Sequence, residues 1–165
     1  MIVLGIDPGY AILGYGVIDA ELNNTRVIDY GIIETTPSML FPERLERLYL
    51  GMQQLISTYR PNEIAFEELF FSKNAKTAIK TSAGRGVALL AAQQAKVRLF
   101  EYTPMQIKLA VTGDGHCDKQ QVQEMVKLLL GLKHIPKPDD AADALAVALC
   151  HGNTTGPASE SFLIK

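Results

Sequence analysis

The 165-residue sequence contains no tryptophan, only two cysteines and only three histidines. Two cysteines cannot build the disulfide framework of a small secreted protein, so we expect free thiols and a cytoplasmic location. No apolar run approaches the roughly eighteen residues that a membrane-spanning helix needs, and Asp7 would interrupt the core of a signal peptide. The sequence therefore indicates neither a disulfide-stabilised module nor a membrane protein.

The few cysteines and histidines also make a poor zinc site. They occur as the adjacent pairs His116-Cys117 and Cys150-His151. Zinc ligands in one segment are usually separated by about two to four residues, and adjacent ligands lack that spacing. We therefore do not expect a zinc centre.

A general excess of positive charge is missing as well, because 16 basic residues face 18 acidic ones and the pI is about 5.9. The charges are nevertheless unevenly distributed. Residues 1–68 contain ten acidic and four basic side chains, net −6, whereas residues 69–110 contain seven basic and one acidic, net +6. Such a basic segment is compatible with a bound polyanion, and equally with a solvated helix face. Nucleic-acid binding through so local a patch would depend steeply on salt.

The opening segment, Met1-Ile-Val-Leu-Gly-Ile-Asp-Pro-Gly9, is the most informative stretch that is present. Its apolar run suits a strand buried on both faces in the middle of a sheet. Pro8 restricts Asp7 to an extended conformation and cannot donate to a strand ladder, so the strand should end there. A carboxylate is thus expected at the rim of a rigid central strand, although an ordinary solvated strand end is the simpler alternative.

The remaining hydrophobic periodicity predicts one α/β domain. Further strands are expected at 14–19, 26–34, 64–66 and 97–101. Helices are expected at 42–59, 74–94, 103–108, 118–131 and 140–151. An antiparallel meander of three strands, followed by alternating helix and strand, predicts a mixed five-stranded sheet with helices on both faces. The domain should span residues 1–152, and the polar residues 153–165 should form a mobile C-terminal tail.

Acidic side chains recur at positions that could bring them together. Glu67 ends the fourth strand as Asp7 ends the first. In the last helix Asp143 is flanked by apolar residues, where a buried and unpaired charge would be costly, unless it lies on a narrow exposed stripe. Asp140 lies three residues earlier on the same helix face, and Asp139 is expected to be the N-cap.

Together these four carboxylates predict a metal site. Asp7, Glu67, Asp140 and Asp143 would repel one another and take up protons unless a cation neutralised them. Oxygen ligands without histidine or cysteine select Mg²⁺ or Mn²⁺ rather than zinc. Two such ions, about 3.5–4 Å apart, would clamp the attacking and leaving oxygens of a phosphodiester. The pattern therefore predicts a metal-dependent nuclease.

Several segments resemble the RuvC family of bacterial Holliday-junction resolvases. They are Gly5-Ile-Asp-Pro-Gly9 with Gly14-Tyr-Gly16, Ala65-Phe-Glu-Glu-Leu-Phe70, Lys73-Asn-Ala75, Gly84-Arg-Gly86 and Asp140-Ala-Ala-Asp-Ala-Leu145, in the family's order. The resemblance implies a ribonuclease H-like fold, a homodimer and magnesium-dependent cleavage, with Mn²⁺ as a substitute and two ions per subunit. It also implies symmetric paired nicks across a four-way DNA junction in recombination and repair, with RuvA and RuvB as partners.

The same resemblance assigns roles to individual residues. The family's four acidic ligands match Asp7, Glu67, Asp140 and Asp143. Phe70 matches an aromatic residue that contacts a base near the crossover, and Lys108 and Lys119 match lysines near the scissile phosphate. Lys73 and Lys76, in the basic segment, are expected to bind DNA as well. The pair Asp139-Asp140 leaves some ambiguity over which aspartate is the ligand. The helix that contains Gly84 and Gly86 matches the region of dimer contact.

Three other interpretations are compatible with the residues. A different ribonuclease H-like nuclease could act on structured RNA, because the opening Gly-x-Asp-x-Gly pattern is widely shared. An actin-like nucleotide-binding domain also has a first strand that ends in Asp, but it needs two lobes and 165 residues provide one. A junction-binding module without catalysis would bind tightly and show no metal-dependent nicking.

Overall fold

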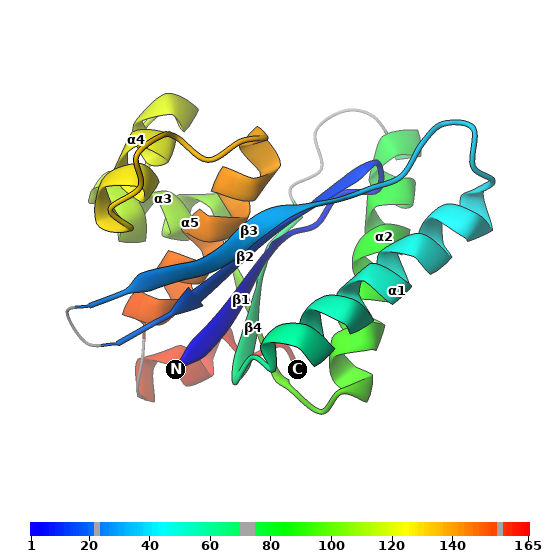
Figure 1. Ribbon diagram of the computed structural model, residues 1–165, viewed down its shortest axis with the longest axis horizontal. Helices are drawn as coiled ribbons and strands as arrows, with labels where there is room; N and C mark the ends of the chain where they lie inside the picture. Colours follow the sequence, from blue (N-terminus) through cyan, green and yellow to red (C-terminus); the bar gives the residue numbers. More distant parts are fainter. Residues whose placement is uncertain (22–23, 70–74, 155–156) are drawn as a thin grey trace.

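The computed structural model describes the chain except residues 22–23, 70–74 and 155–156 (Figure 1). The strands are β1 (Ile2–Asp7), β2 (Ile12–Asp19), β3 (Arg26–Glu34), β4 (Glu63–Glu67) and β5 (Arg98–Tyr102). The helices are α1 (Phe41–Tyr59), α2 (Ala75–Gln94), α3 (Pro104–Thr112), α4 (Lys119–Leu129) and α5 (Asp139–Asn153), followed by a short 3₁₀ helix, Pro157–Phe162. No helix among the described residues has the length and apolar character to span a membrane.

The strands form one mixed sheet in the order β3-β2-β1-β4-β5. β1, β2 and β3 make an antiparallel meander, whereas β4 runs parallel to β1 and β5 runs parallel to β4. β1 is therefore the central strand, and its Val3 and Leu4 are both fully buried although they face opposite sides of the sheet. The predicted meander and the predicted central strand are confirmed.

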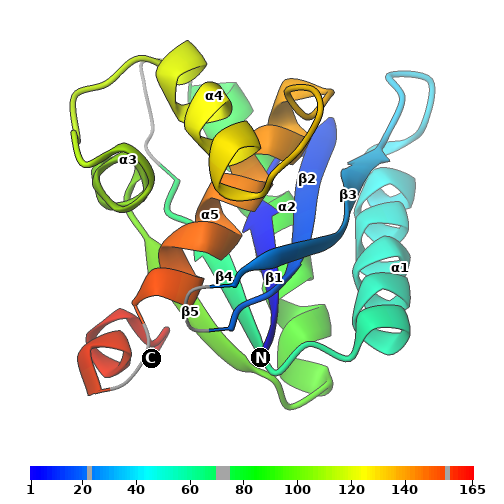
Figure 2. The ribbon, with the colours of Figure 1, turned by 60° about the vertical axis from the view of Figure 1, so that its left-hand side comes forward.

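Helices cover both faces of the sheet, as predicted. Helices α1 and α2 lie on one face, and α3, α4 and α5 lie on the other (Figures 1 and 2). Each face has its own buried cluster. Leu48, Met52 and Phe66 belong to the α1–α2 side, and Phe100 and Leu145 to the α5 side.

Helix α5 packs very closely on the sheet because β1 and β2 present glycine to it. A Cβ atom on Gly5 would lie 2.2 Å from the carbonyl oxygen of Ala144, and one on Gly14 would lie 2.1 Å from that of Asp140. A side chain at either strand position would force the helix away. The glycines therefore hold the N-terminal turn of α5 against β2, beside the end of β1.

The helix ends agree with the sequence at α4 and differ at α5. The Asp118 side chain accepts a hydrogen bond of 2.8 Å from the Gln121 backbone N–H, which is the predicted capping box. Helix α5 begins one residue earlier than expected, and its N-cap is Pro138. The prediction of Asp139 as N-cap is therefore wrong. Asp139 lies in the first turn, and Lys137 donates a 2.7 Å hydrogen bond to its carboxylate.

The described part of residues 153–165 packs against β5, in contrast to the mobile tail that we expected. Leu163 forms a β-bridge with Phe100, and the Ile164 backbone N–H donates to the Leu99 carbonyl oxygen at 2.9 Å. The Phe162 ring lies 4.8 Å from that of Tyr102, centroid to centroid. The apolar triplet Phe-Leu-Ile explains the difference, because it buries against the sheet while the residues before it are polar.

Candidate active site

Four acidic residues are carried to one end of the sheet by three elements. Asp7 ends β1 and Glu67 ends β4, and these strands are parallel neighbours in which Ile6 pairs with Phe66. Asp140 and Asp143 lie in the first turns of α5, which Gly14 allows to approach β2. Strand pairing fixes the first two carboxylates, and close helix packing fixes the other two.

The four carboxylates act on one another electrostatically. Burial raises the pKa of Asp7 to about 8, and the charges of Glu67, Asp143 and Asp140, in decreasing order, raise it further. Lys119 opposes this shift. Only charges that are close act strongly across a partly buried site, so the predicted convergence of the two strand ends and the helix is present.

Glu67 and Asp143 share this electrostatic field. Burial, followed by the charge of Asp143, raises the pKa of Glu67 to about 7, and Lys119 and Lys108 act in the opposite direction. Burial also raises the pKa of Asp143, against the hydrogen bond and charge of Lys119. The cluster without a cation therefore retains protons near neutral pH, which carboxylates in water do not.

The two lysines predicted at the site lie beside these acids. Lys119 Nζ contacts Asp143 Oδ2 at 2.6 Å, and Lys108 Nζ donates to the Cys117 carbonyl oxygen at 2.7 Å. Both lysines line an open hollow of about 180 Å³ together with Glu67 and Asp143. Negative and positive groups thus share one surface depression at the end of β4.

The donor set fits a hard divalent cation. Within the described ranges, no three acidic, histidine or cysteine side chains already surround a point where an ion could sit, and Asp143 is instead held by Lys119. The residues that converge carry only carboxylate oxygens, which suit Mg²⁺ or Mn²⁺. Their raised pKa values show an excess of buried negative charge that a cation would relieve. The assignment of Asp7, Glu67, Asp140 and Asp143 as metal ligands stays a prediction.

The other predicted site residues have different outcomes. Phe70 and Lys73 lie outside the described residues, and Lys76 falls in the first turn of α2, where only the backbone is described. The ambiguity between Asp139 and Asp140 is reduced by the charges. Asp140 acts on Asp7, whereas the largest influence on Asp139 is its hydrogen bond to Lys137, which lowers its pKa.

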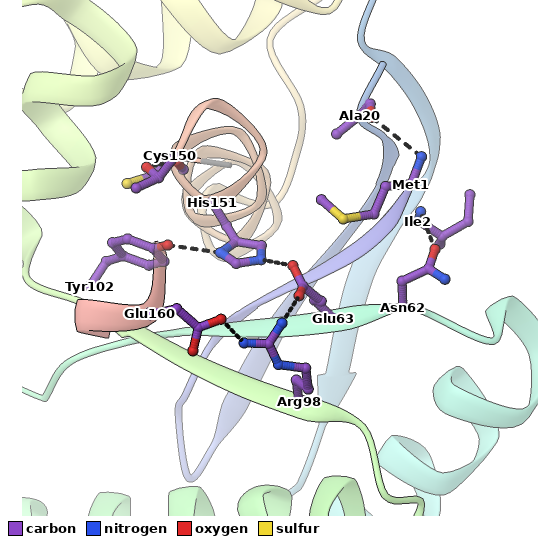
Figure 3. A network of polar contacts seen from close by, with 11 residues as sticks. Met1, Ile2, Ala20, Asn62, Glu63, Arg98, Tyr102, Cys150, His151 and Glu160 are labelled. Carbon is purple, nitrogen blue, oxygen red and sulfur yellow. Dashed lines mark hydrogen bonds and ion pairs between the residues drawn. The ribbon is translucent and has the colours of Figure 1, made fainter. Parts of the chain in front are cut away.

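The sequence analysis did not identify a buried polar network at the opposite end of α5 (Figure 3). The Tyr102 hydroxyl lies 2.8 Å from His151 Nδ1, and His151 Nε2 lies 2.7 Å from Glu63. Arg98 bonds Glu63 at 3.1 Å and also pairs with Glu160 of the 3₁₀ helix. Burial lowers the pKa of His151, so the neutral ring accepts from the tyrosine hydroxyl and donates to the carboxylate. The network joins the C-terminal end of α5 to β4, β5 and the C-terminal segment.

A β3-β2-β1-β4-β5 sheet with acids at the tips of its two central strands and on the covering helix defines a ribonuclease H-like protein. The comparisons place the chain within this class. It belongs to the RuvC family, whose model, described as crossover junction endodeoxyribonuclease RuvC, matches residues 3–151.

Individual relatives agree with this assignment over almost the whole chain. The crossover junction endodeoxyribonuclease RuvC of Alkaliphilus oremlandii is 53% identical over 165 residues, which cover 100% of both chains. The protein of the same name from Ruminiclostridium cellulolyticum is 56% identical over 154 residues, 93% of both chains. Among solved structures, T. thermophilus RuvC in complex with Holliday junction substrate is 36% identical with a TM-score of 0.86, covering 93% of this chain and 94% of the other.

Proposed function

We propose that this protein resolves Holliday junctions by paired symmetric nicks, as a homodimer, in DNA recombination and repair. The observation that carries the proposal is the electrostatic coupling of Asp7 with acids from β4 and α5, in a chain of the RuvC family. The complex of the T. thermophilus relative with Holliday junction substrate supports the choice of a four-way DNA junction.

The proposed cofactor is Mg²⁺, with Mn²⁺ as a substitute and two ions per subunit. Asp7, Glu67, Asp140 and Asp143 would hold it, because they are the carboxylates that converge at the end of β1. When bound, the ions would activate a water molecule for in-line attack and stabilise the leaving oxygen of the phosphodiester. The products would carry 5′-phosphate and 3′-hydroxyl ends.

The residues of the chain prepare the site in two ways. Asp7 and Glu67 are fixed on paired strands, so their carboxylates need little rearrangement. Lys119 now neutralises Asp143 at 2.6 Å, and a cation that took over this role would free the ammonium group for a phosphate. Lys108 is held in place by the Cys117 carbonyl oxygen, with its charge beside Glu67. Both lysines would then stabilise charge that develops in the transition state.

Other contacts with DNA and proteins are proposed from the family resemblance. Phe70 would stack on a base near the crossover, and Lys73 and Lys76 would contact phosphates nearby. RuvA and RuvB, which drive branch migration, would deliver the junction. These contacts lie in or beside the basic segment at residues 69–110.

The proposal is tested with a synthetic four-way junction in which each strand is labelled in turn. With Mg²⁺ we expect nicks at symmetric positions in two opposing strands, and much weaker cleavage of linear duplex and of structured RNA. Asp7→Asn should abolish nicking but retain junction binding with Ca²⁺ in place of Mg²⁺, because phosphate contacts come from basic residues. The matched control is Asp19→Asn, at the opposite end of β2, where the carboxylate pairs with the N-terminal amine.

Each result has a distinct meaning. Nicking by Asp7→Asn at the wild-type rate would remove this residue from the mechanism. Preferential cleavage of structured RNA by the wild-type protein would support the alternative ribonuclease. Tight junction binding without nicking at any divalent ion would leave a binding module.

A further inference from the structure

A cluster of aromatic and cationic side chains lies three residues beyond Asp7, in the turn between β1 and β2. The Tyr10 ring has the guanidinium carbon of Arg44 at 3.8 Å from its centroid and Lys80 Nζ at 5.7 Å. The Phe41 ring lies 5.5 Å away in a tilted arrangement. These side chains come from the turn, from α1 and from α2, which meet near the end of the sheet that carries the acids (Figure 1).

The turn that carries Tyr10 is held firmly. Arg44 is only 9% exposed, and its Nε donates to Thr35 Oγ1 at 2.7 Å. Thr35 Oγ1 in turn donates to the Tyr10 carbonyl oxygen at 2.9 Å. On the other side, a Cβ on Gly84 would lie 3.4 Å from the Gly9 carbonyl oxygen, so α2 packs directly against the turn. The Tyr10 ring is therefore preorganised, and Arg44 is a positioning residue.

The charges of this cluster are not neutralised by acids. Within the described ranges, neither Arg44 nor Lys80 takes part in an ion pair, although most other described basic groups near the sheet do. Lys80 is exposed and Tyr10 is partly exposed. A cation beside an aromatic ring keeps its attraction for an anion, and the ring offers a surface on which a nucleotide can pack.

We propose that Lys80 and Tyr10 form a nucleic-acid contact on the α1–α2 side of the active site. Lys80 binds a backbone phosphate, and Tyr10 packs against the adjoining nucleotide of the same strand. This inference rests on the proposed function, because it extends the DNA track from the acidic cluster across the tip of β1. The occupant is DNA rather than an acidic protein, because the cluster begins three residues from the proposed cleavage site.

The test measures junction affinity against salt for single variants of the full chain. Fluorescence anisotropy of a labelled four-way junction, with Ca²⁺ to prevent cleavage, gives the dissociation constant at several NaCl concentrations. Lys80→Gln should weaken binding and reduce the slope of log K against log salt by about 0.9, the value for one lost phosphate contact. Lys80→Arg should restore both. The control Lys133→Gln, an exposed lysine between α4 and α5, should change neither.

The ring is tested separately from the charge. Tyr10→Leu should weaken junction binding about five-fold or more with an unchanged salt slope, since stacking on one nucleotide contributes about 1–3 kcal/mol. Tyr10→Phe keeps the ring and should bind like the wild type. Thermal unfolding of each variant verifies the fold, so that a loss of affinity is not confused with unfolding.

Two results would overturn the inference. One is an unchanged salt slope in Lys80→Gln. The other is a change in the sedimentation of the DNA-free protein, which would make the cluster a contact between copies of the chain. Symmetric nicking by the wild type is scored independently. If nicking is present and the slope is unchanged, this inference alone fails, whereas a wild type that neither binds nor nicks junctions removes the proposed function.

Discussion

The carbonyl oxygen of Asp140 lies against Gly14, so closely that a Cβ on the glycine would be 2.1 Å from it. The contact fixes the height of the α5 N-terminus above β2. It therefore also fixes where two of the four site carboxylates lie.

Substitution of this glycine should separate folding from cleavage. We expect Gly14→Ala to lift the first turn of α5 and to lower the single-turnover nicking rate about ten-fold or more, because small misplacements of reacting groups are costly. Overpacking should also cost about 1–3 kcal/mol of unfolding free energy. The control Gly86→Ala has nothing within 4 Å of its new methyl group and should keep or slightly raise stability. Wild-type nicking by Gly14→Ala would contradict this role.

The stability of the metal-free protein should depend on pH through Asp7. Its pKa is about 8 when folded, against 3.8 for the model group, so the folded state keeps a proton that the unfolded state has already released. The free energy of unfolding should therefore be highest near pH 4 and fall as the pH rises toward 8. Urea unfolding with a chelator at several pH values measures this. Asp7→Asn should flatten the profile, and an unchanged profile in the variant would assign the effect to other groups.

Lys119 should compete with a divalent ion for Asp143, because the two side chains are in contact at 2.6 Å. We expect Lys119→Gln to bind Mg²⁺ several-fold more tightly in calorimetry without DNA. Its nicking rate should nevertheless fall about ten-fold or more, because a transition-state cation is lost. Lys137→Gln removes a lysine that contacts Asp139 instead and serves as the control. Weaker Mg²⁺ binding by Lys119→Gln would refute the competition.

Tyr102 should stabilise the fold without taking part in cleavage. Tyr102→Phe leaves the buried His151 Nδ1 without its partner, which should cost about 1–3 kcal/mol of unfolding free energy. The network lies at the opposite end of α5 from the acids, so nicking at saturating Mg²⁺ and low temperature should be unchanged. Denaturant unfolding and a nicking assay on the same preparation test both statements. A large loss of nicking in a fully folded variant would connect the two ends of the helix.

The C-terminal segment should be dispensable for cleavage and useful for solubility. Deletion of residues 157–165 removes the bridge to Phe100 and exposes the edge of β5. We expect the melting temperature to fall by several degrees and aggregation to increase, with nicking retained. Loss of nicking in a folded deletion variant would place the segment within the functional domain.

The sequence predicted the elements whose signals are local. The apolar run that ends at Asp7 identified the central strand, and the Asp118–Gln121 pair identified the start of α4. The four acids could be selected because strand ends and one helix face restrict where side chains can meet. The N-cap of α5 was wrong because Pro138 occupies that position, and ion pairing with Lys137 draws Asp139 aside.

What the sequence could not show depends on contacts between distant residues. His151 reads as an ordinary residue after an apolar run, and its partner Glu63 lies 88 positions earlier. The Tyr10 cluster likewise combines a turn with two helices, and neither cation has a sequence spacing that marks it. The apolar Phe-Leu-Ile triplet in the C-terminal segment was visible, but its burial depends on an open edge of β5 that only the fold supplies.

Close packing of α5 on glycine has a consequence for how this enzyme family can vary. Two carboxylates ride on the same helix whose alanines, among them Ala144 and Ala148, meet Gly5 of the central strand. Enlarging any of these interior side chains would alter the spacing of the acids without touching them. The dimensions of the reaction centre are thus written into the oily interior, and selection for cleavage is at the same time selection for small residues far from the DNA.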